Sequence, residues 1–149
     1  MYGLVNRAIE GLITAGHGAD RWEQVRRAAG VDVERFVSSE AYPDEITYRL
    51  VAAAAEVLGQ PPASILRAFG RHWVGHTARE GYGALLDAAG ETLPEFLERL
   101  PDLHARIGLV YPHLRPPVFA IAERGPAHVV VDYRSTRDGL GPMVEGLLE

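Results

Sequence analysis

The chain has 149 residues, enough for one domain with a sizeable hydrophobic core, and its 47% hydrophobic and 23% charged residues are ordinary for a folded globular protein. Its net charge of −5 makes the chain as a whole a poor electrostatic match for nucleic acid or an anionic membrane. It contains no cysteine, which excludes disulfides, thiolate zinc sites and thiol nucleophiles. No run of 18 apolar residues and no secretory leader pattern occur, so we expect a single cytoplasmic domain over residues 1–149.

The first 114 residues are patterned as a series of helices. Apolar residues recur at helical spacing between breaks at glycine or proline, as in residues 3–13. Thr92, followed by Glu95 three residues later, is a typical helix start. The predicted helices cover residues 3–13, 21–29, 44–58, 61–73 and 93–114.

The pattern changes after residue 114. Residues 116–122 and 128–133 are rich in β-branched and aromatic side chains and are separated by Gly125-Pro126, which predicts a β-hairpin. Residues 143–149 predict the start of a further helix, inside which the chain ends. A helical N-terminal part followed by a small antiparallel sheet and a C-terminal helix places the chain in the α+β class. A two-stranded hairpin is marginally stable by itself, so we expect a complete sheet to need further strands.

His104 is the first candidate for a functional site, because it lies on an apolar stripe of the predicted helix 93–114. That stripe also holds four other residues: Leu97, Leu100, Ile107 and Tyr111. Such a histidine is most often a core residue bonded to a backbone carbonyl. The alternative is an imidazole directed from a helix into an apolar cavity, which is how proteins present an axial ligand to a haem iron.

A row of polar residues follows the second predicted strand. If residues 133–137 are extended, Tyr133, Ser135 and Arg137 point to one side. They supply three hydrogen-bond donors, one of them a permanent cation whose planar fork suits carboxylates. One interpretation is a solvated strand face. The other is a binding site for carboxylates such as the two propionates of a haem.

Three groups of residues together carry a resemblance that none of them carries alone. In chain order they are Leu100-Pro101-x-Leu103-His104-x-Arg106-Ile107, then Tyr111-Pro112-x-Leu114-x-Pro116-Pro117-x-Phe119, then Tyr133-x-Ser135-x-Arg137-x-Gly139-Leu140. With Met1-Tyr2-Gly3 and Phe69-Gly70-Arg71-x-Trp73 as well, the chain resembles the haem nitric oxide/oxygen-binding (H-NOX) family from end to end. That family includes the sensory domain of soluble guanylate cyclase. Its domain continues through a longer helix and further strands, which we expect this chain to lack.

The resemblance implies a non-covalent haem b and a role for nine residues. His104 would be the axial ligand of the iron, and Pro117 would press on the porphyrin and help to keep it distorted. The propionates would be bound by Tyr133, Ser135 and Arg137. Four further residues would line or flank the pocket, although core packing explains each of them nearly as well: Val5, Ile9, Trp73 and Leu140.

The resemblance also implies a function, that of a sensor without catalytic activity of its own. It would bind nitric oxide, or carbon monoxide in vitro, at a ferrous haem, and would signal to a partner as the Fe–His104 bond weakens. In bacteria the family's partners are typically a histidine kinase, a cyclic-dinucleotide enzyme or a chemotaxis receptor. Oxygen-binding members use a distal tyrosine after the Y-x-S-x-R motif. Here no tyrosine follows Tyr133, so we expect no stable binding of dioxygen. A haem enzyme and a cofactor-free interaction domain are the alternative functions.

Two remaining features have simpler interpretations. His72 and His76 lie four residues apart, which is a metal-ligand spacing. No third ligand is clearly placed beside them, so we expect a solvated pair. Gly81-Tyr82-Gly83 is expected to form a flexible turn.

Overall fold

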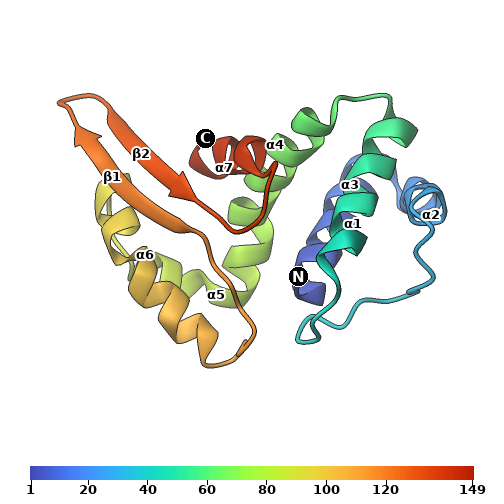
Figure 1. Ribbon diagram of the computed structural model, residues 1–149, viewed down its shortest axis with the longest axis horizontal. Coiled ribbons are helices and arrows are strands. Elements are labelled where there is room, and N and C mark those ends of the chain that lie inside the picture. The colour runs from blue at the N-terminus through green and yellow to red at the C-terminus, as the bar shows by residue number, and fades with distance from the viewer. The chain divides into compact units, whose positions relative to one another are not determined.

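The computed structural model describes residues 1–149, which fold into two compact units. Unit 1 comprises residues 1–77 and 139–149, and unit 2 comprises residues 78–138. Unit 1 contains α1 (Gly3–His17), α2 (Ala19–Ala28), α3 (Asp44–Leu58), α4 (Pro62–His72), the π-helical turn η1 (Trp73–Thr77) and α7 (Gly141–Leu148). Unit 2 contains α5 (Ala78–Asp87), α6 (Leu93–Gly108), β1 (Val118–Arg124) and β2 (Val129–Arg134) (Figure 1). The single domain over residues 1–149 stays a prediction.

The core of unit 1 lies among its first four helices. The apolar stripe of α1 is buried as its spacing predicts, with Ile9 and Ile13 among the least exposed residues of the chain. One polar pair lies in this core. The hydroxyl of Thr47 on α3 donates a hydrogen bond of 2.7 Å to the amide oxygen of Asn6 on α1. This bond ties the two helices together at a buried point.

The C-terminal helix α7 packs on α4, beside which it lies in Figure 1. The two helices approach closely because a glycine lies on each side of the crossing, Gly70 on α4 and Gly146 on α7. A Cβ at Gly70 would lie 2.7 Å from the amide nitrogen of Leu147, so no larger residue fits there without movement. Exposed ion pairs of Arg67 and Arg71 with acidic residues of α7 line the edge of the crossing.

Unit 2 is a β-hairpin that packs on α6. β1 and β2 are antiparallel, with Phe119 opposite Tyr133 and Ile121 opposite Val131, and the register shifts after Ile121. The inner face of the hairpin covers the apolar side of α6 (Figure 1). The residues at the centre of this small core are Leu97, Leu100, Leu103, Phe119, Ile121 and Val131.

The α+β prediction is confirmed, and three local predictions are wrong. The helix predicted over residues 93–114 ends at Gly108. The strands begin one or two residues later than predicted, and the first cannot start before Val118 because Pro116 and Pro117 have no N–H to donate to a sheet. The segment expected to be a flexible turn, residues 81–83, lies inside α5.

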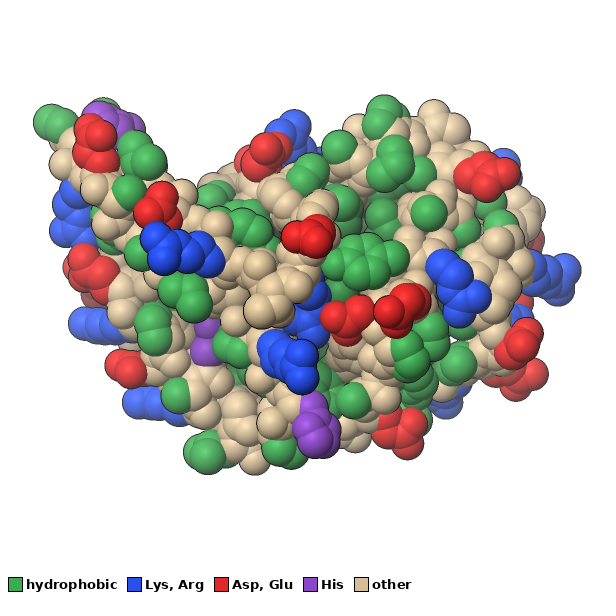
Figure 2. All heavy atoms as spheres, in the orientation of Figure 1, with side chains coloured by type: hydrophobic (Ala, Val, Ile, Leu, Met, Phe, Trp, Pro, Cys, Tyr) green, Lys and Arg blue, Asp and Glu red, His purple; other side chains and the backbone are tan.

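The surface shows no strong preference for one charge. On the face drawn in Figure 2, acidic and basic side chains are interspersed and neither forms a large patch. This mixture agrees with the modest net charge of −5. None of the helices combines the length and the apolar character that crossing a membrane requires.

Candidate functional site

The helix that carries His104 begins at a well-defined cap. The Thr92 side-chain oxygen accepts a hydrogen bond of 3.4 Å from the Glu95 amide, as the sequence predicts. The Glu95 carboxylate in turn accepts a bond of 3.0 Å from the amide of Glu91, one residue before the cap. Pro94 occupies the first turn, where its missing N–H costs no helical bond. Together these residues determine where α6 starts.

A second proline lies inside α6, at Pro101, three residues before His104. Proline cannot donate the bond that would run to the carbonyl of Leu97, so the backbone ladder of α6 lacks one rung there. Helices bend most readily at such points. The segment with His104 is thus joined to the start of α6 through a weakened turn.

His104 is half-buried, next to the buried Leu103. Burial holds the pKa of the His104 imidazole below its ordinary value, because the low-dielectric surroundings disfavour the cation. At neutral pH the ring is therefore uncharged and has a lone pair that a metal ion can accept. Tyr111, which the sequence analysis placed on the same stripe, lies beyond the end of α6.

The polar triplet lies at the end of β2 and in the turn that follows. The Tyr133 ring lies beside that of Phe119, with centroids 5.4 Å apart. Ser135 and Arg137 are not extended, because the strand ends one residue after Tyr133. Instead the Ser135 hydroxyl accepts a bond of 3.0 Å from the Arg137 amide. All three side chains are half-buried while the residues between them are exposed, so the predicted alternation holds although a turn produces half of it.

Arg137 joins this turn to the segment that leads into β1. Its Nη1 donates a bond of 2.9 Å to the carbonyl of Arg115, two residues before Pro117. Pro117 is half-buried and immediately precedes β1. The triplet and Pro117 are therefore held in one arrangement at the end of the hairpin, and His104 belongs to the same compact unit.

The four apolar residues of the predicted pocket belong to unit 1. Ile9 is 1% exposed within the helical core. Val5 and Trp73 are half-buried against that core, and the Trp73 ring meets Phe69 edge-on at 5.9 Å. Leu140 is the half-buried residue that precedes α7. Their packing within unit 1 accounts for Val5, Ile9 and Trp73, and their role as pocket residues stays a prediction.

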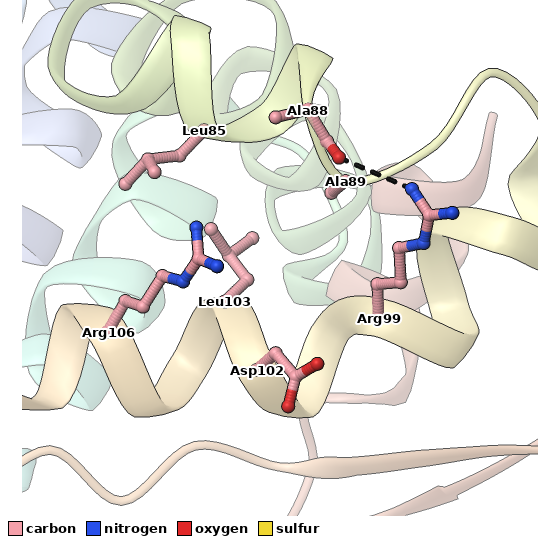
Figure 3. A pocket seen from close by; sticks show the side chains of 7 residues that line it. All are labelled: Leu85, Ala88, Ala89, Arg99, Asp102, Leu103 and Arg106. Carbon is pink, nitrogen blue, oxygen red and sulfur yellow. Dashed lines mark hydrogen bonds between the residues drawn. The ribbon is translucent and has the colours of Figure 1, made fainter.

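A small cavity of about 80 Å³ lies between α5 and α6 of unit 2. Leu85 and Leu103 face it from the two helices, and Arg99, Asp102 and Arg106 stand at its rim (Figure 3). A pocket for a drug-sized cofactor needs about 300–1,000 Å³. None of the nine predicted haem residues lines this cavity, so it is a packing gap and not the predicted haem site.

The donor set of unit 2 fits a haem. The His104 imidazole, kept neutral by burial, has the form that ligates iron. Arg137, Ser135 and Tyr133 offer the charged and neutral donors that carboxylates such as propionates accept. The donors are ordered by their own contacts, the Arg137 guanidinium through the Arg115 carbonyl and the Ser135 hydroxyl through the Arg137 amide.

Comparison with known proteins agrees with this chemistry. A family model described as haem-NO-binding matches residues 2–149. The chain belongs to the haem-NO-binding family. It is 27% identical over 146 residues to soluble guanylate cyclase gcy-31 of Caenorhabditis elegans, covering 98% of this chain and 21% of the relative. It is 31% identical over 151 residues to gcy-35 of the same animal, covering 99% of this chain and 22% of the relative.

This haem-NO-binding chain thus spans about a fifth of the length of the guanylate cyclases that it matches. Among solved structures, an H-NOX protein from S. oneidensis in the Fe(II)NO ligation state matches with a TM-score of 0.86 and 19% identity, covering 99% of this chain and 81% of that chain. This likeness shows a shared fold. The family and the fold class predicted from the sequence motifs are both confirmed, and H-NOX domains bind haem.

Two contacts of this haem-NO-binding domain escaped the sequence analysis. The hydroxyls of Tyr82 and Tyr111 form a hydrogen bond, and burial together with that bond raises the pKa of Tyr82 to about 12. The rings of His72 and His76 are stacked, with centroids 4.6 Å apart. No group of three or more histidine, aspartate or glutamate side chains that could hold a metal ion surrounds this pair. Nothing in the local pattern of the sequence indicated that the two tyrosines meet.

Proposed function

We propose that this haem-NO-binding domain is a gas sensor that holds haem b through His104, binds nitric oxide and signals as the Fe–His104 bond weakens. The observation that carries the proposal is the half-buried, neutral His104 imidazole on α6, in the same compact unit as the triplet Tyr133, Ser135 and Arg137. The family match and the donor set support it, because each names the same cofactor by an independent route.

When bound, a ferrous haem accepts nitric oxide at the iron and loosens the iron's bond on the opposite side. The protein's part is to convert that change into movement of its own elements. His104 connects the iron to α6, and Leu97, Leu100 and Leu103 connect α6 to the hairpin. Release of the imidazole frees the later part of α6 to follow its own packing, with Pro101 as the weakened turn. The shift is as large as the difference in ligand affinity between the two states allows.

The propionate anchors and Pro117 have separate tasks in this proposal. Arg137 binds a propionate through charge-assisted hydrogen bonds, which are roughly twice as strong as neutral ones, and Ser135 and Tyr133 add neutral donors. Pro117 is rigid at φ and stands where the Arg137–Arg115 bond anchors the chain. It therefore offers a firm surface against the porphyrin.

We further propose that the ferrous protein binds nitric oxide and carbon monoxide but not dioxygen in a stable form. Stable binding of dioxygen needs a distal hydrogen-bond donor, which oxygen-binding members of the family supply as a tyrosine on the helix after the Y-x-S-x-R motif. In this chain that helix is α7, residues 141–148, and its only polar side chain is Glu145. Glu145 is exposed and paired with Arg67.

The proposed partner is a signalling protein or a further domain of the same polypeptide. A histidine kinase, a cyclic-dinucleotide enzyme and a chemotaxis receptor are the kinds that the family resemblance favours, and the cytoplasm is the proposed location. The large unmatched part of each guanylate cyclase relative agrees with a sensor that works with other domains.

The central experiment replaces His104 with glycine and restores the ligand with imidazole. One glycine inside α6 costs about 1 kcal/mol, so the fold should survive. Purified His104→Gly protein is expected to lose the ferrous spectrum of a histidine-ligated haem and to regain it when imidazole is added. His113→Gly, an exposed histidine in the same unit, is the matched control and should keep the wild-type spectrum. An unchanged spectrum in His104→Gly would show that another residue holds the iron.

Gas selectivity is tested on the reduced wild-type protein. Its visible bands should shift on exposure to nitric oxide and to carbon monoxide, and exposure to air should give oxidation without a lasting dioxygen spectrum. A dioxygen spectrum that persists for hours would overturn the selectivity proposal and leave the assignment of His104 intact.

A further inference from the structure

Tyr82 and Tyr111 are joined by a hydrogen bond between their hydroxyls, and both side chains are half-buried within unit 2. Tyr82 belongs to α5 and Tyr111 follows the end of α6. The bond therefore connects the helix that carries His104 to the helix before it in the chain.

The backbone of α5 is bent at Tyr82. With φ −139° and ψ 19°, Tyr82 is the non-helical residue inside this helix. Gly81 and Gly83 flank it, and glycines weaken a helix enough to permit such a kink. The kink gives up helical geometry at the residue whose hydroxyl reaches Tyr111.

Tyr111 is firmly attached to the last turn of α6. Its amide and that of Val110 both donate to the carbonyl of Ile107, at 3.0 Å each. Its own carbonyl accepts a bond of 2.9 Å from the amide of Leu114. Leu109 and Val110 between them are 86% and 65% exposed, so apolar packing does little to hold this turn. The Tyr82 hydroxyl is thus a main anchor for the end of α6.

The middle of the α5–α6 interface is loosely packed. The cavity of about 80 Å³ lies there, with Leu85 and Leu103 on opposite sides of it (Figure 3). The other polar tie is a long bond of 3.5 Å from Arg99 to the carbonyl of Ala88, near the start of α6. A loosely packed interface with polar ties at its two ends resists sliding mainly through those ties.

We propose that the Tyr82–Tyr111 hydrogen bond is a latch that holds the C-terminal end of α6 against α5 and thereby sets how readily His104 leaves the iron. The two tyrosines are positioning residues that act through α6. The inference rests on the proposed function, since it assumes that His104 is the axial ligand. His104 lies between Pro101 and Tyr111, so the latch restrains the part of α6 that the proline leaves most free to move.

The test compares Tyr82→Phe, Tyr111→Phe and the double variant with wild type, as haem-loaded protein. Each variant loses one hydroxyl and keeps the ring. We expect His104 to be released about five-fold faster after nitric oxide is added, followed by the change in the Soret band. This factor corresponds to about 1 kcal/mol, an ordinary net value for one hydrogen bond. The double variant should match the single ones, because all three lack the same bond.

A second readout does not depend on the cofactor. Hydrogen exchange of the Val110 and Tyr111 amides should be about five-fold faster in the haem-free variants than in haem-free wild type. Tyr48→Phe is the control. Tyr48 lies on α3 in unit 1, and its loss should change neither the exchange of these amides nor the release of His104.

The outcomes separate the latch from the proposed function. If wild-type protein keeps no histidine-ligated haem, the proposed function fails, and unchanged amide exchange in the variants would overturn the latch as well. If the variants lose stability but release His104 at the wild-type rate, the pair is merely structural and the latch is wrong. Effects of the single variants that add in the double variant would also refute it, because the two hydroxyls would then act separately.

Discussion

Gly146→Ala is expected to destabilise unit 1 by separating α7 from α4. A Cβ on Gly146 would lie 2.8 Å from the carbonyl carbon of Arg67 and 3.0 Å from its Cα, and closer still to its carbonyl oxygen. These are backbone atoms of a helix, which cannot rotate away as the end of a flexible side chain can. The added methyl group must therefore push α7 outward.

The size of the effect follows from this displacement. Restoring a 3.4 Å separation from the Arg67 carbonyl carbon moves α7 by at least about 0.6 Å. Burial of Val144 and half-burial of Met143 and Leu147 together contribute roughly 4 kcal/mol. A gap of about 0.5–1 Å forfeits a quarter to a half of such packing. Overpacking strain costs a further ~1–3 kcal/mol, whereas the better helix propensity of alanine returns ~1 kcal/mol. We expect a net loss of roughly 2–3 kcal/mol in the free energy of unfolding.

Urea unfolding followed by circular dichroism measures this loss. Gly141→Ala is the matched control, since Gly141 belongs to the same helix and no atom lies within 4 Å of its added Cβ. It should be neutral or slightly stabilising. Equal stability of Gly146→Ala and Gly141→Ala would refute the close backbone approach of α4 and α7 on which the reasoning depends.

Three further predictions address unit 2. Arg137→Ala should weaken haem binding by roughly 2–3 kcal/mol through the loss of charge-assisted bonds, and Arg137→Lys should recover only part because an ammonium lacks the fork. Transfer of haem to apomyoglobin measures both, and a wild-type rate from Arg137→Ala would contradict the assignment. Pro101→Ala should restore a backbone bond to Leu97 and raise the free energy of unfolding by up to ~3 kcal/mol, which an unchanged urea midpoint would disprove. Because the pKa of Tyr82 is raised to about 12 in the folded chain, its contribution to stability should be complete below about pH 10 and lost as the pH rises from about 10 towards 12. Tyr82→Phe should lack that part of the pH dependence, and an identical slope in both proteins would count against the buried pair.

The local elements and the chemistry of the site were predictable because their signals are local. The stripe of α1 and the cap at Thr92 follow from periodicity and from the hydrogen bonds that termini require. The Gly125-Pro126 break likewise predicted the hairpin. For His104 the residue pattern alone left a core histidine and an iron ligand as alternatives. Its association with the Pro-Pro and Y-x-S-x-R motifs identified the family, which the comparison confirmed.

Errors in the prediction arose where a short pattern has two solutions. The apolar run after Gly108 continues the helical period, yet α6 ends there and the amides of Val110 and Tyr111 share one carbonyl. The glycines around Tyr82 predicted a turn, whereas neighbouring backbone bonds keep that segment in a kinked helix. In both cases the surrounding structure overrode local propensity.

By itself, the sequence determined the order and type of the elements, the family, and the residue types that suit a haem. Only the tertiary structure decided which distant residues meet. Gly70 faces α7 across a close helix crossing, Tyr82 bonds Tyr111, and Arg137 bonds the Arg115 carbonyl. Burial, which holds the pKa of His104 below its ordinary value, is also a property of the folded chain. The physical reason is that periodicity and capping act over a few residues, whereas packing and desolvation depend on segments that only folding brings together.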